Sequence, residues 1–405
     1  MKHIACSKMW TDLTISIPRK QIKHCCKRKY YKISEEDIDR LGMDVFQFST
    51  NIANERRYTI NENKLPAGCT ECLDMWPNSY WHLWNKWKDR EWDRLELLAL
   101  EEKSISSLIE ITLSSTCNMT CMYCAPNISS QWNTLLNQPL EEDLVYKRKM
   151  LNALYDYIEH YQVPAEHRPI QYDFIGGEPL LDLEIFEVIE RLLEIHSSNK
   201  QKEITIGIIS NLNVKPKLVE RLIQRAEENS TVKWKMKLSI DAVGQIGETQ
   251  RDGLNLELWE QNFIKLIKSP AIEIVILPTV TNVGLEGFPQ LIEYITSLFE
   301  KHGTADKNWF FAENIVIQPL AMHPGTLPES YSKIIDESIR VAELKIQPHK
   351  GKRTIVRFLN NLRKMLGTKR SPEDLAEVKR FFEWQGQRKN KNYMEIFPSL
   401  KDILE

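Results

Sequence analysis

Between about residue 107 and residue 345, short β-branched apolar runs alternate with longer stretches whose apolar residues recur three and four positions apart. The short runs predict buried strands, and the longer stretches predict amphipathic helices. The six predicted strands cover 107–113, 170–176, 203–210, 232–240, 271–280 and 313–321. The six predicted helices cover 144–161, 183–196, 215–229, 256–268, 288–302 and 331–344.

This alternation predicts an α/β fold in which a parallel sheet is covered by helices. Six strand–helix units are too few for a closed eight-stranded barrel, so they suit a partial barrel or a doubly wound sheet. In both arrangements, ligands bind at the carboxyl ends of the strands. Four polar or glycine-bearing segments follow predicted strands, namely STCNMTCMYC, GGEP, SNLN and SIDAVG. We therefore expect these four segments to form one site.

The two ends of the chain differ from this alternating region. Residues 1–106 contain cysteines and end in a tryptophan-rich helical stretch, whereas residues 346–405 are helical and locally basic. We predict three parts, with boundaries at 1–106, 107–345 and 346–405. From Lys350 to Lys391 there are thirteen Lys and Arg against four Asp and Glu. Such a surface is usually only solvated, and binding of phosphates or of an acidic leader peptide is the alternative.

Composition and charge exclude several classes of protein. The 405-residue chain has a formal net charge of −2, with 42% hydrophobic and 27% charged residues, which is typical of a globular protein and gives no general affinity for polyanions. No apolar run approaches the roughly 20 residues that span a bilayer, and the first residues lack a signal-peptide pattern. We expect a cytoplasmic protein with no membrane partner, and a nucleic-acid partner is not expected. In a reducing compartment, its eight cysteines are better explained as metal ligands than as disulfides.

The cysteines fall into two groups. Five lie in the first 72 residues, three more lie between positions 117 and 124, and none follows. The first group is Cys6, Cys25, Cys26, Cys69 and Cys72, and the second is Cys117, Cys121 and Cys124. Two separate metal sites are the simplest interpretation.

The second group has the spacing Cys-x3-Cys-x2-Cys directly after a predicted strand. A cubane iron–sulfur cluster normally has four cysteine ligands, so three cysteines leave one iron open for chemistry. The alternative is a zinc ion held by three cysteines and a histidine, but no His lies between Ser104 and Asp156.

The spacing, with Tyr123 directly before the last cysteine, resembles the signature of the radical S-adenosylmethionine (SAM) superfamily. The resemblance implies a partial (β/α)6 barrel of the TIM type and a 4Fe–4S cluster on Cys117, Cys121 and Cys124. It further implies that SAM chelates the open iron and is cleaved by an electron from the cluster. The resulting 5′-deoxyadenosyl radical abstracts hydrogen from the substrate. A reductant such as flavodoxin or ferredoxin is then an expected partner.

The same resemblance implies cofactor contacts at the strand ends. The residues concerned are Tyr123, Gly176, Gly177, Glu178, Pro179, Ser210, Asn211, Ser239, Asp241 and Arg251. Paired glycines let the backbone approach a ligand closely, and Glu178 can accept from the SAM ammonium group. Arg251 matches an arginine that related enzymes use near the SAM carboxylate. For the residues that end the third and fourth strands, capping of the strand end is an equal alternative.

The N-terminal cysteines resemble the "twitch" form of the SPASM-type module, which carries an auxiliary 4Fe–4S cluster. The resemblance implies ligation by Cys6, Cys69, Cys72 and one of the adjacent pair, with Cys25 slightly favoured over Cys26. A structural zinc site of four cysteines is the alternative. In related enzymes this module usually follows the barrel, whereas in this chain it precedes the barrel. The substrates of the better-known enzymes are therefore a weaker guide to the substrate of this chain.

These features lead to three functional hypotheses. The first is a radical SAM oxidoreductase that crosslinks, dehydrogenates or epimerises a ribosomally made peptide, with Cys26 as a candidate hydrogen donor. The second is radical SAM modification of a small molecule such as a nucleotide, sugar or amino acid. The third is a zinc-binding, non-enzymatic module on a degenerate barrel.

Two further features have alternative interpretations. Trp81, Trp84 and Trp87 form a helical stripe that we expect to pack the N-terminal part onto the barrel, with substrate stacking as the alternative. His323 follows the sixth predicted strand, where it could transfer protons or have no role.

Overall fold

A computed structural model describes most of the region after residue 105 and parts of the region before it. The described residues are 12–24, 30–48, 54–55, 58, 62, 106–138, 142–160, 170–198, 203–304, 308–312, 314–346 and 350–405. The five N-terminal cysteines and the tryptophan stripe lie outside the described residues, namely Cys6, Cys25, Cys26, Cys69, Cys72, Trp81, Trp84 and Trp87. The auxiliary metal site and the tryptophan stripe therefore stay predictions.

The chain divides into two compact units. Unit 1 comprises Met1–Ser115 and Glu141–Gly207, and unit 2 comprises Thr116–Leu140 and Ile208–Glu405. The strand β6, Ile204–Ser210, crosses the boundary between them. The three cysteines of the second group belong to unit 2, and the Gly-Gly-Glu-Pro segment belongs to unit 1.

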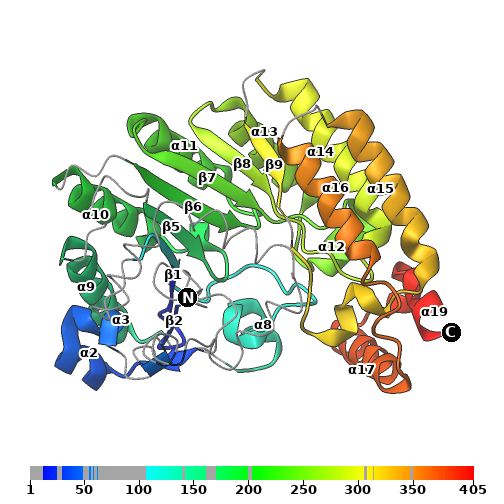
Figure 1. Cartoon of the computed structure of the whole chain (residues 1–405), viewed down its shortest axis with the longest axis horizontal. Coiled ribbons are helices and arrows are strands. Elements are labelled where there is room, and N and C mark those ends of the chain that lie inside the picture. Colours follow the sequence, from blue (N-terminus) through cyan, green and yellow to red (C-terminus); the bar gives the residue numbers. More distant parts are fainter. Residues whose placement is uncertain are drawn as a thin grey trace. The chain divides into compact units, whose positions relative to one another are not determined.

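Unit 1 is built on a mixed sheet. Its strands are β1 (Asp12–Ser16), β2 (Gln21–Lys23), β3 (Tyr31–Lys32), β4 (Leu108–Thr112) and β5 (Ile170–Ile175). Its helices are α2 (Glu35–Leu41), α3 (Val45–Phe48), α9 (Leu144–His160) and α10 (Glu184–Ser198), of which α9 and α10 pack side by side (Figure 1). The pairs β1–β2 and β2–β3 are antiparallel, whereas β1–β4 and β4–β5 are parallel.

The parallel pairing of β1 with β4 was not predicted from the sequence. Ile15 of β1 lies opposite Ile111 of β4, and neither side chain is exposed to solvent. The polar–apolar alternation of "DLTIS" is typical of a strand with one buried face, but it is only five residues long. A segment from the cysteine-bearing N-terminal region thus extends the sheet that begins at residue 108.

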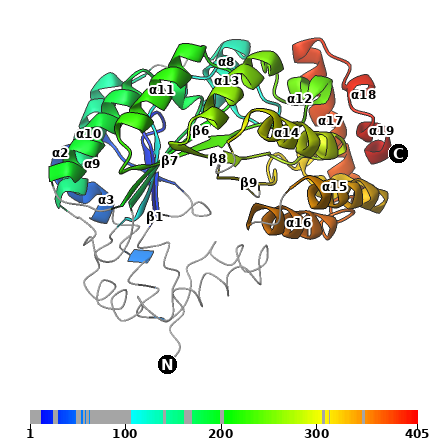
Figure 2. The ribbon, with the colours of Figure 1, turned by 90° about the horizontal axis from the view of Figure 1, so that it is seen from above.

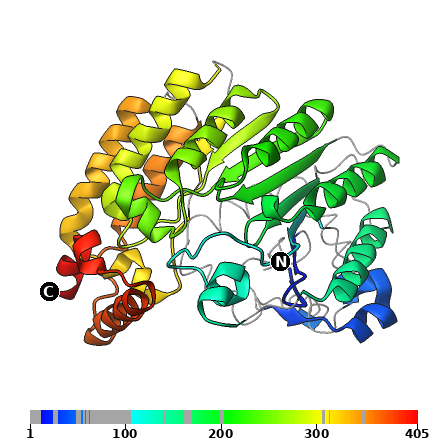
Figure 3. The same ribbon diagram turned by 180° about the vertical axis from the view of Figure 1, so that it is seen from behind.

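Unit 2 is built from parallel strands and a longer series of helices. Its strands are β7 (Lys233–Leu238), β8 (Ile272–Ile276) and β9 (Trp309–Phe311). Its helices are α8 (Ser130–Leu135), α11 (Pro216–Glu228), α12 (Gly244–Gln250), α13 (Leu256–Lys268), α14 (Phe288–His302), α15 (Ser332–Lys345), α16 (Lys350–Arg363), α17 (Pro372–Lys389), α18 (Tyr393–Ile396) and α19 (Ser399–Leu404). Helices α11, α13, α14, α15 and α16 pack in succession (Figure 1). Figures 2 and 3 show α17 beside the short helices that end the chain.

Aromatic side chains form the core between the outer helices and β9. Trp259 of α13 stacks on Phe263, which meets Phe299 of α14 edge to face. Phe299 in turn stacks on Trp309 of β9, with ring centroids 4.3 Å apart. These residues bury large apolar surfaces, so they contribute strongly to the stability of unit 2.

The structure confirms the α/β fold class with parallel strands and outer helices, and it confirms the six predicted helices and the first five predicted strands. The sixth strand was predicted at 313–321, but β9 is at 309–311. The later segment contributes only an isolated bridge between Val280 and Ile315. Pro319 lacks the N–H that a sheet needs, whereas the aromatic run of β9 packs against α14.

None of the described helices combines the length and apolar character that crossing a bilayer requires.

The aromatic core gives a first prediction. Trp259 is fully buried, so Trp259→Ala should lower the free energy of unfolding by about 3–5 kcal/mol through lost burial and a cavity. Urea unfolding followed by tryptophan fluorescence and circular dichroism measures the change. Leu344→Ala is the control, because Leu344 is 70% exposed and should alter stability by no more than about 0.5 kcal/mol. Equal stability of the two variants would contradict the prediction.

Candidate functional site

The cysteine loop, defined here as residues 117–124, precedes α8 in unit 2. The side chain of Cys121 is buried, whereas Cys117 and Cys124 are partly exposed. Ser130, the first residue of α8, holds the start of the loop because its hydroxyl oxygen accepts from the Cys117 N–H at 3.0 Å and donates to the Cys117 carbonyl at 3.1 Å. The three thiols are therefore carried on one loop that is tied to the following helix.

The segment after α12 pairs with the middle of the loop. The N–H of Thr120 donates to the Asp252 carbonyl at 2.8 Å, and the N–H of Met122 donates to the Gln250 carbonyl at 2.9 Å. Cys121 lies between the two donor residues of the loop, and Arg251 lies between the two acceptor residues of the facing segment. The guanidinium Nη1 of Arg251 consequently lies 3.8 Å from the Cys121 sulfur.

Asp241 joins the loop to the strand ends of unit 2. One carboxylate oxygen accepts from Tyr123 Oη at 2.6 Å, Arg251 Nε at 2.9 Å and Gln250 Nε2 at 2.9 Å. The other accepts from the Thr279 N–H at 2.7 Å. The Asp241 side chain is fully buried. Protein donors thus engage both oxygens, and a direct contact of Asp241 with a cofactor stays a prediction.

Burial and charge set the ionisation of this site. Burial raises the pKa of the Cys121 thiol to about 12, although the positive charge of Arg251 acts in the opposite direction. Burial also raises the pKa of Tyr123 well above its usual value, so the phenol remains a donor. For Arg251, burial opposes the charge but Asp241 outweighs it, and the pKa is raised overall. In this surrounding, Cys121 therefore favours the neutral thiol over the thiolate.

The end of β6 also reaches the cysteine loop. Asn211 Nδ2 donates to the side-chain oxygen of Asn118 at 3.0 Å, and Asn118 donates to the Asn213 carbonyl. Ser210 caps the following turn, because its hydroxyl oxygen accepts from the N–H of Leu212, whose φ is +57°. The Ser239 N–H donates to the Ser210 carbonyl, which aligns the ends of neighbouring segments. Of these predicted residues, Asn211 touches the loop directly.

The Gly-Gly-Glu-Pro segment follows β5 in unit 1. Gly176 has a φ of +125°, and a Cβ there would lie 2.6 Å from the Thr112 methyl carbon, so only glycine fits. Glu178 is buried and accepts from the Leu180 N–H at 3.1 Å, and Gly177 and Pro179 complete the turn. The segment thus has the tight backbone expected of it, while its contact with a cofactor stays a prediction.

His323 has a structural role in unit 2. It is buried, and its Nδ1 accepts from the Gly325 N–H at 2.8 Å, which caps a short 3-10 helix at Pro324–Thr326. Burial and the nearby Lys369 lower its pKa, so the ring stays neutral and acts as an acceptor. The structure thus gives His323 a structural contact, and a part in proton transfer stays a prediction.

The residues of the loop fit a cubane iron–sulfur cluster. Three thiols on one loop supply soft ligands for three irons, and the adjacent Arg251 offsets the negative charge that thiolates and sulfide bring. Among the described residues, no three His, Cys, Asp or Glu side chains are arranged to share one metal ion. Sequence reasoning missed Ser130, Asn118, Gln250 and Thr279, because polar residues of this kind carry no motif and act through the fold.

Comparison with known proteins gives a sequence match and several structural likenesses. No family model matches the chain. The chain is 25% identical over 136 residues to the radical SAM cyclopropyl synthase TigE of Paramaledivibacter caminithermalis. This match supports the radical SAM resemblance. It covers 33% of this chain and only 28% of the relative's length.

Two solved structures are similar at a low level. Native anSMEcpe with bound AdoMet is 21% identical with a TM-score of 0.41, covering 58% of this chain and 61% of that one. Native anSMEcpe with bound AdoMet and Cp18Cys peptide is 20% identical with a TM-score of 0.39, covering 58% of this chain and 59% of that one. Similarity at this level does not by itself establish a shared fold.

The buried ion pair gives a second prediction. Asp241→Asn keeps the shape of the side chain but leaves the Arg251 charge buried and unpaired, which should lower the free energy of unfolding by about 3–5 kcal/mol. Urea unfolding of the metal-free protein measures this loss. Glu337→Gln breaks an exposed ion pair with Arg340 and should give no measurable change. An unchanged stability of Asp241→Asn would show that Arg251 finds another partner.

Proposed function

We propose that this chain is a radical SAM enzyme, with Cys117, Cys121 and Cys124 as the ligands of a 4Fe–4S cluster. The observation that supports this proposal most strongly is the position of Cys121, which is buried beside Arg251 in a loop that carries three cysteines. When bound, such a cluster supplies the electron that cleaves SAM and yields a 5′-deoxyadenosyl radical. The weak sequence match to a radical SAM synthase points in the same direction.

The chain's own residues hold and orient this chemistry. Asp241 fixes Tyr123 and Arg251, and Arg251 keeps a positive charge beside Cys121. We propose that the remaining predicted cofactor residues line the SAM site, where the glycines allow close approach and Glu178 accepts from the ammonium group. The set is Gly176, Gly177, Glu178, Pro179, Ser210, Asn211 and Ser239.

A second, auxiliary 4Fe–4S cluster is proposed for the N-terminal twitch-like part. Its ligands would be Cys6, Cys69, Cys72 and one of Cys25 and Cys26. Such a cluster can accept an electron from a substrate radical, which favours net two-electron oxidation. Flavodoxin or ferredoxin is the proposed reductant for the enzyme.

For the substrate, we propose a ribosomally made peptide that is crosslinked, dehydrogenated or epimerised. The twitch resemblance and the Ser239-Ile-Asp241 pattern support this choice, because both are typical of peptide-modifying enzymes. Modification of a small molecule such as a nucleotide, sugar or amino acid is the alternative.

Iron counting tests both proposed clusters. Anaerobically reconstituted wild-type protein should bind about eight irons, two cubanes' worth, and should cleave SAM on reduction with dithionite. The triple variant Cys117→Ala, Cys121→Ala, Cys124→Ala should bind about four irons and lose SAM cleavage. The double variant Cys69→Ala, Cys72→Ala should also lose about four irons but should still cleave SAM.

The possible outcomes separate the hypotheses. Zinc in the triple variant in place of iron would overturn the auxiliary cluster and leave the radical SAM proposal intact. Wild-type protein that binds zinc alone and does not cleave SAM would favour the non-enzymatic alternative.

Mass spectrometry tests the proposed substrate class. Cells that express the protein together with short open reading frames from its genomic neighbourhood should contain a peptide that has lost two hydrogen atoms, or one with an epimerised residue detectable by chiral amino-acid analysis. The triple cysteine variant is the control and should leave the peptide unmodified. A modified small molecule with no change in any peptide would favour the alternative substrate class.

A further inference from the structure

Helix α17 contacts the cysteine loop on both sides of its central thiol. Lys389 Nζ donates to the Thr120 carbonyl at 2.6 Å and lies 3.2 Å from the Thr120 hydroxyl oxygen. Gln385 Nε2 donates to the Met122 carbonyl at 3.2 Å. Thr120 and Met122 are the neighbours of Cys121, and the two donors are four residues apart on one face of α17.

A tryptophan pair completes this contact. The indole N–H of Trp132 in α8 donates to the Cys121 carbonyl at 3.0 Å. Its ring stacks on Trp384 of α17, with centroids 6.0 Å apart, and Lys389 Nζ lies 4.5 Å from the ring centroid of Trp132. Three consecutive carbonyls, those of residues 120–122, thus accept bonds from side chains that α17 supplies or supports.

The two donors are buried, which indicates that these contacts matter to the fold. The Lys389 side chain is 3% exposed and Gln385 is 1% exposed. A lysine is seldom buried unless it is paired, because desolvating its charge is costly. Lys389 is paired with Asp252 at 3.1 Å, whose carbonyl accepts from Thr120. The ammonium group therefore bridges the loop and the segment that faces it.

We propose that α17 is a clamp on the cysteine loop, in which Gln385 and Lys389 are positioning residues that fix Cys121 for its cluster. The inference rests on the proposed function. Reduction of a cluster adds one negative charge, so a buried cation close by favours the reduced form. The charge of Lys389 should consequently raise the reduction potential of a cluster on Cys117, Cys121 and Cys124.

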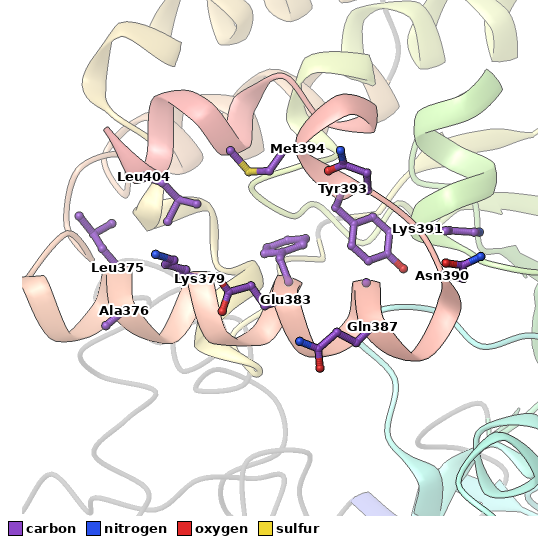
Figure 4. Close-up of a pocket in the computed structure, with 13 residues that line it drawn as sticks. Leu375, Ala376, Lys379, Glu383, Gln387, Asn390, Lys391, Tyr393, Met394 and Leu404 are labelled. Atoms are coloured by element: carbon purple, nitrogen blue, oxygen red, sulfur yellow. The ribbon is translucent and has the colours of Figure 1, made fainter.

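Two residues near the donors provide matched controls, one on α17 and one just after it. A groove of about 970 Å³ lies between α17 and the short helices that follow. Glu383, Gln387 and Lys391 are among the residues that line it (Figure 4). Gln387 is exposed there and lies two residues from Gln385. Lys391 binds the same carboxylate as Lys389, at 2.7 Å from Asp252 Oδ1, by its own separate contact. The pairs Gln385→Leu with Gln387→Leu and Lys389→Met with Lys391→Met therefore make equal chemical changes at the two donors to the loop carbonyls and at two nearby residues, and the Lys391 ammonium group bonds only to Asp252 among the described residues.

The first measurement uses anaerobic, cluster-free protein. Cys121 is labelled with a maleimide, and the rate of labelling at Cys121 is measured by peptide mapping. Circular dichroism checks that each variant is folded. Gln385→Leu and Lys389→Met should label Cys121 about tenfold faster than wild type, because the loop opens more often. Gln387→Leu and Lys391→Met should label at the wild-type rate. Equal rates in all four folded variants would overturn the clamp.

The second measurement uses reconstituted protein in a redox titration followed by electron paramagnetic resonance. The signal of interest is the one that changes on addition of SAM. Lys389→Met should shift its midpoint to a more negative potential, so that at a fixed potential the ratio of reduced to oxidised cluster falls about tenfold, or about 59 mV for one electron. Lys391→Met should shift it less, and Lys389→Arg should restore the wild-type value because it keeps the charge.

The two measurements separate the clamp from the proposed function. Wild-type protein that assembles no cluster would overturn the proposed function, while the labelling rates would still decide whether α17 holds the loop. A normal cluster with equal midpoints for Lys389→Met and Lys391→Met would overturn the charge effect of Lys389. Faster labelling of Cys121 together with the more negative midpoint supports the inference in full.

Discussion

The carboxylate of Asp241 has to keep its donors, because an ionised group without partners in a protein interior is strongly destabilising. Its partners are Tyr123 from the cysteine loop, Gln250 and Arg251 from the end of α12, and the backbone of Thr279 after β8. One side chain thereby connects three segments that are far apart in the sequence. The position of Cys121 depends on this connection, since Arg251 and the pairing partners of the loop lie in one of the three segments.

The aromatic core of unit 2 and the cysteine loop are held together by different kinds of interaction. The apolar core of unit 2 stacks aromatic side chains between the outer helices and β9. The loop buries the side chains of Met119 and Met122, and its backbone is also held by hydrogen bonds from other segments. Such bonds are directional, so they fix the orientation of three thiols more closely than hydrophobic packing would. A cofactor that binds there meets a preorganised set of ligands.

The sequence was sufficient for those parts of the site that local patterns encode. Apolar periodicity predicted α9, α10, α11, α13, α14 and α15 and five of the six expected parallel strands, and the cysteine spacing predicted the loop. It failed where tertiary contacts decide the outcome, as in β9, where aromatic packing against α14 outweighs the β-branched run that follows. It also failed for Gln385 and Lys389, because a glutamine and a lysine on a basic helix look like ordinary surface residues. Their burial becomes visible only when α17 is placed beside the loop.

The long separation between the loop and α17 has a consequence for biosynthesis. Lys389 follows Thr120 by 269 positions, so the cysteines leave the ribosome long before the residues that hold them. At about 5–20 residues per second, that delay is on the order of 10–50 s. During this time the thiols are present, but Gln385 and Lys389, which donate to the carbonyls of Met122 and Thr120, have not yet been made. If the cysteines hold a cluster as proposed, its assembly site is complete only after α17 has been made, and a product truncated before α17 would carry the cysteines without these two donors.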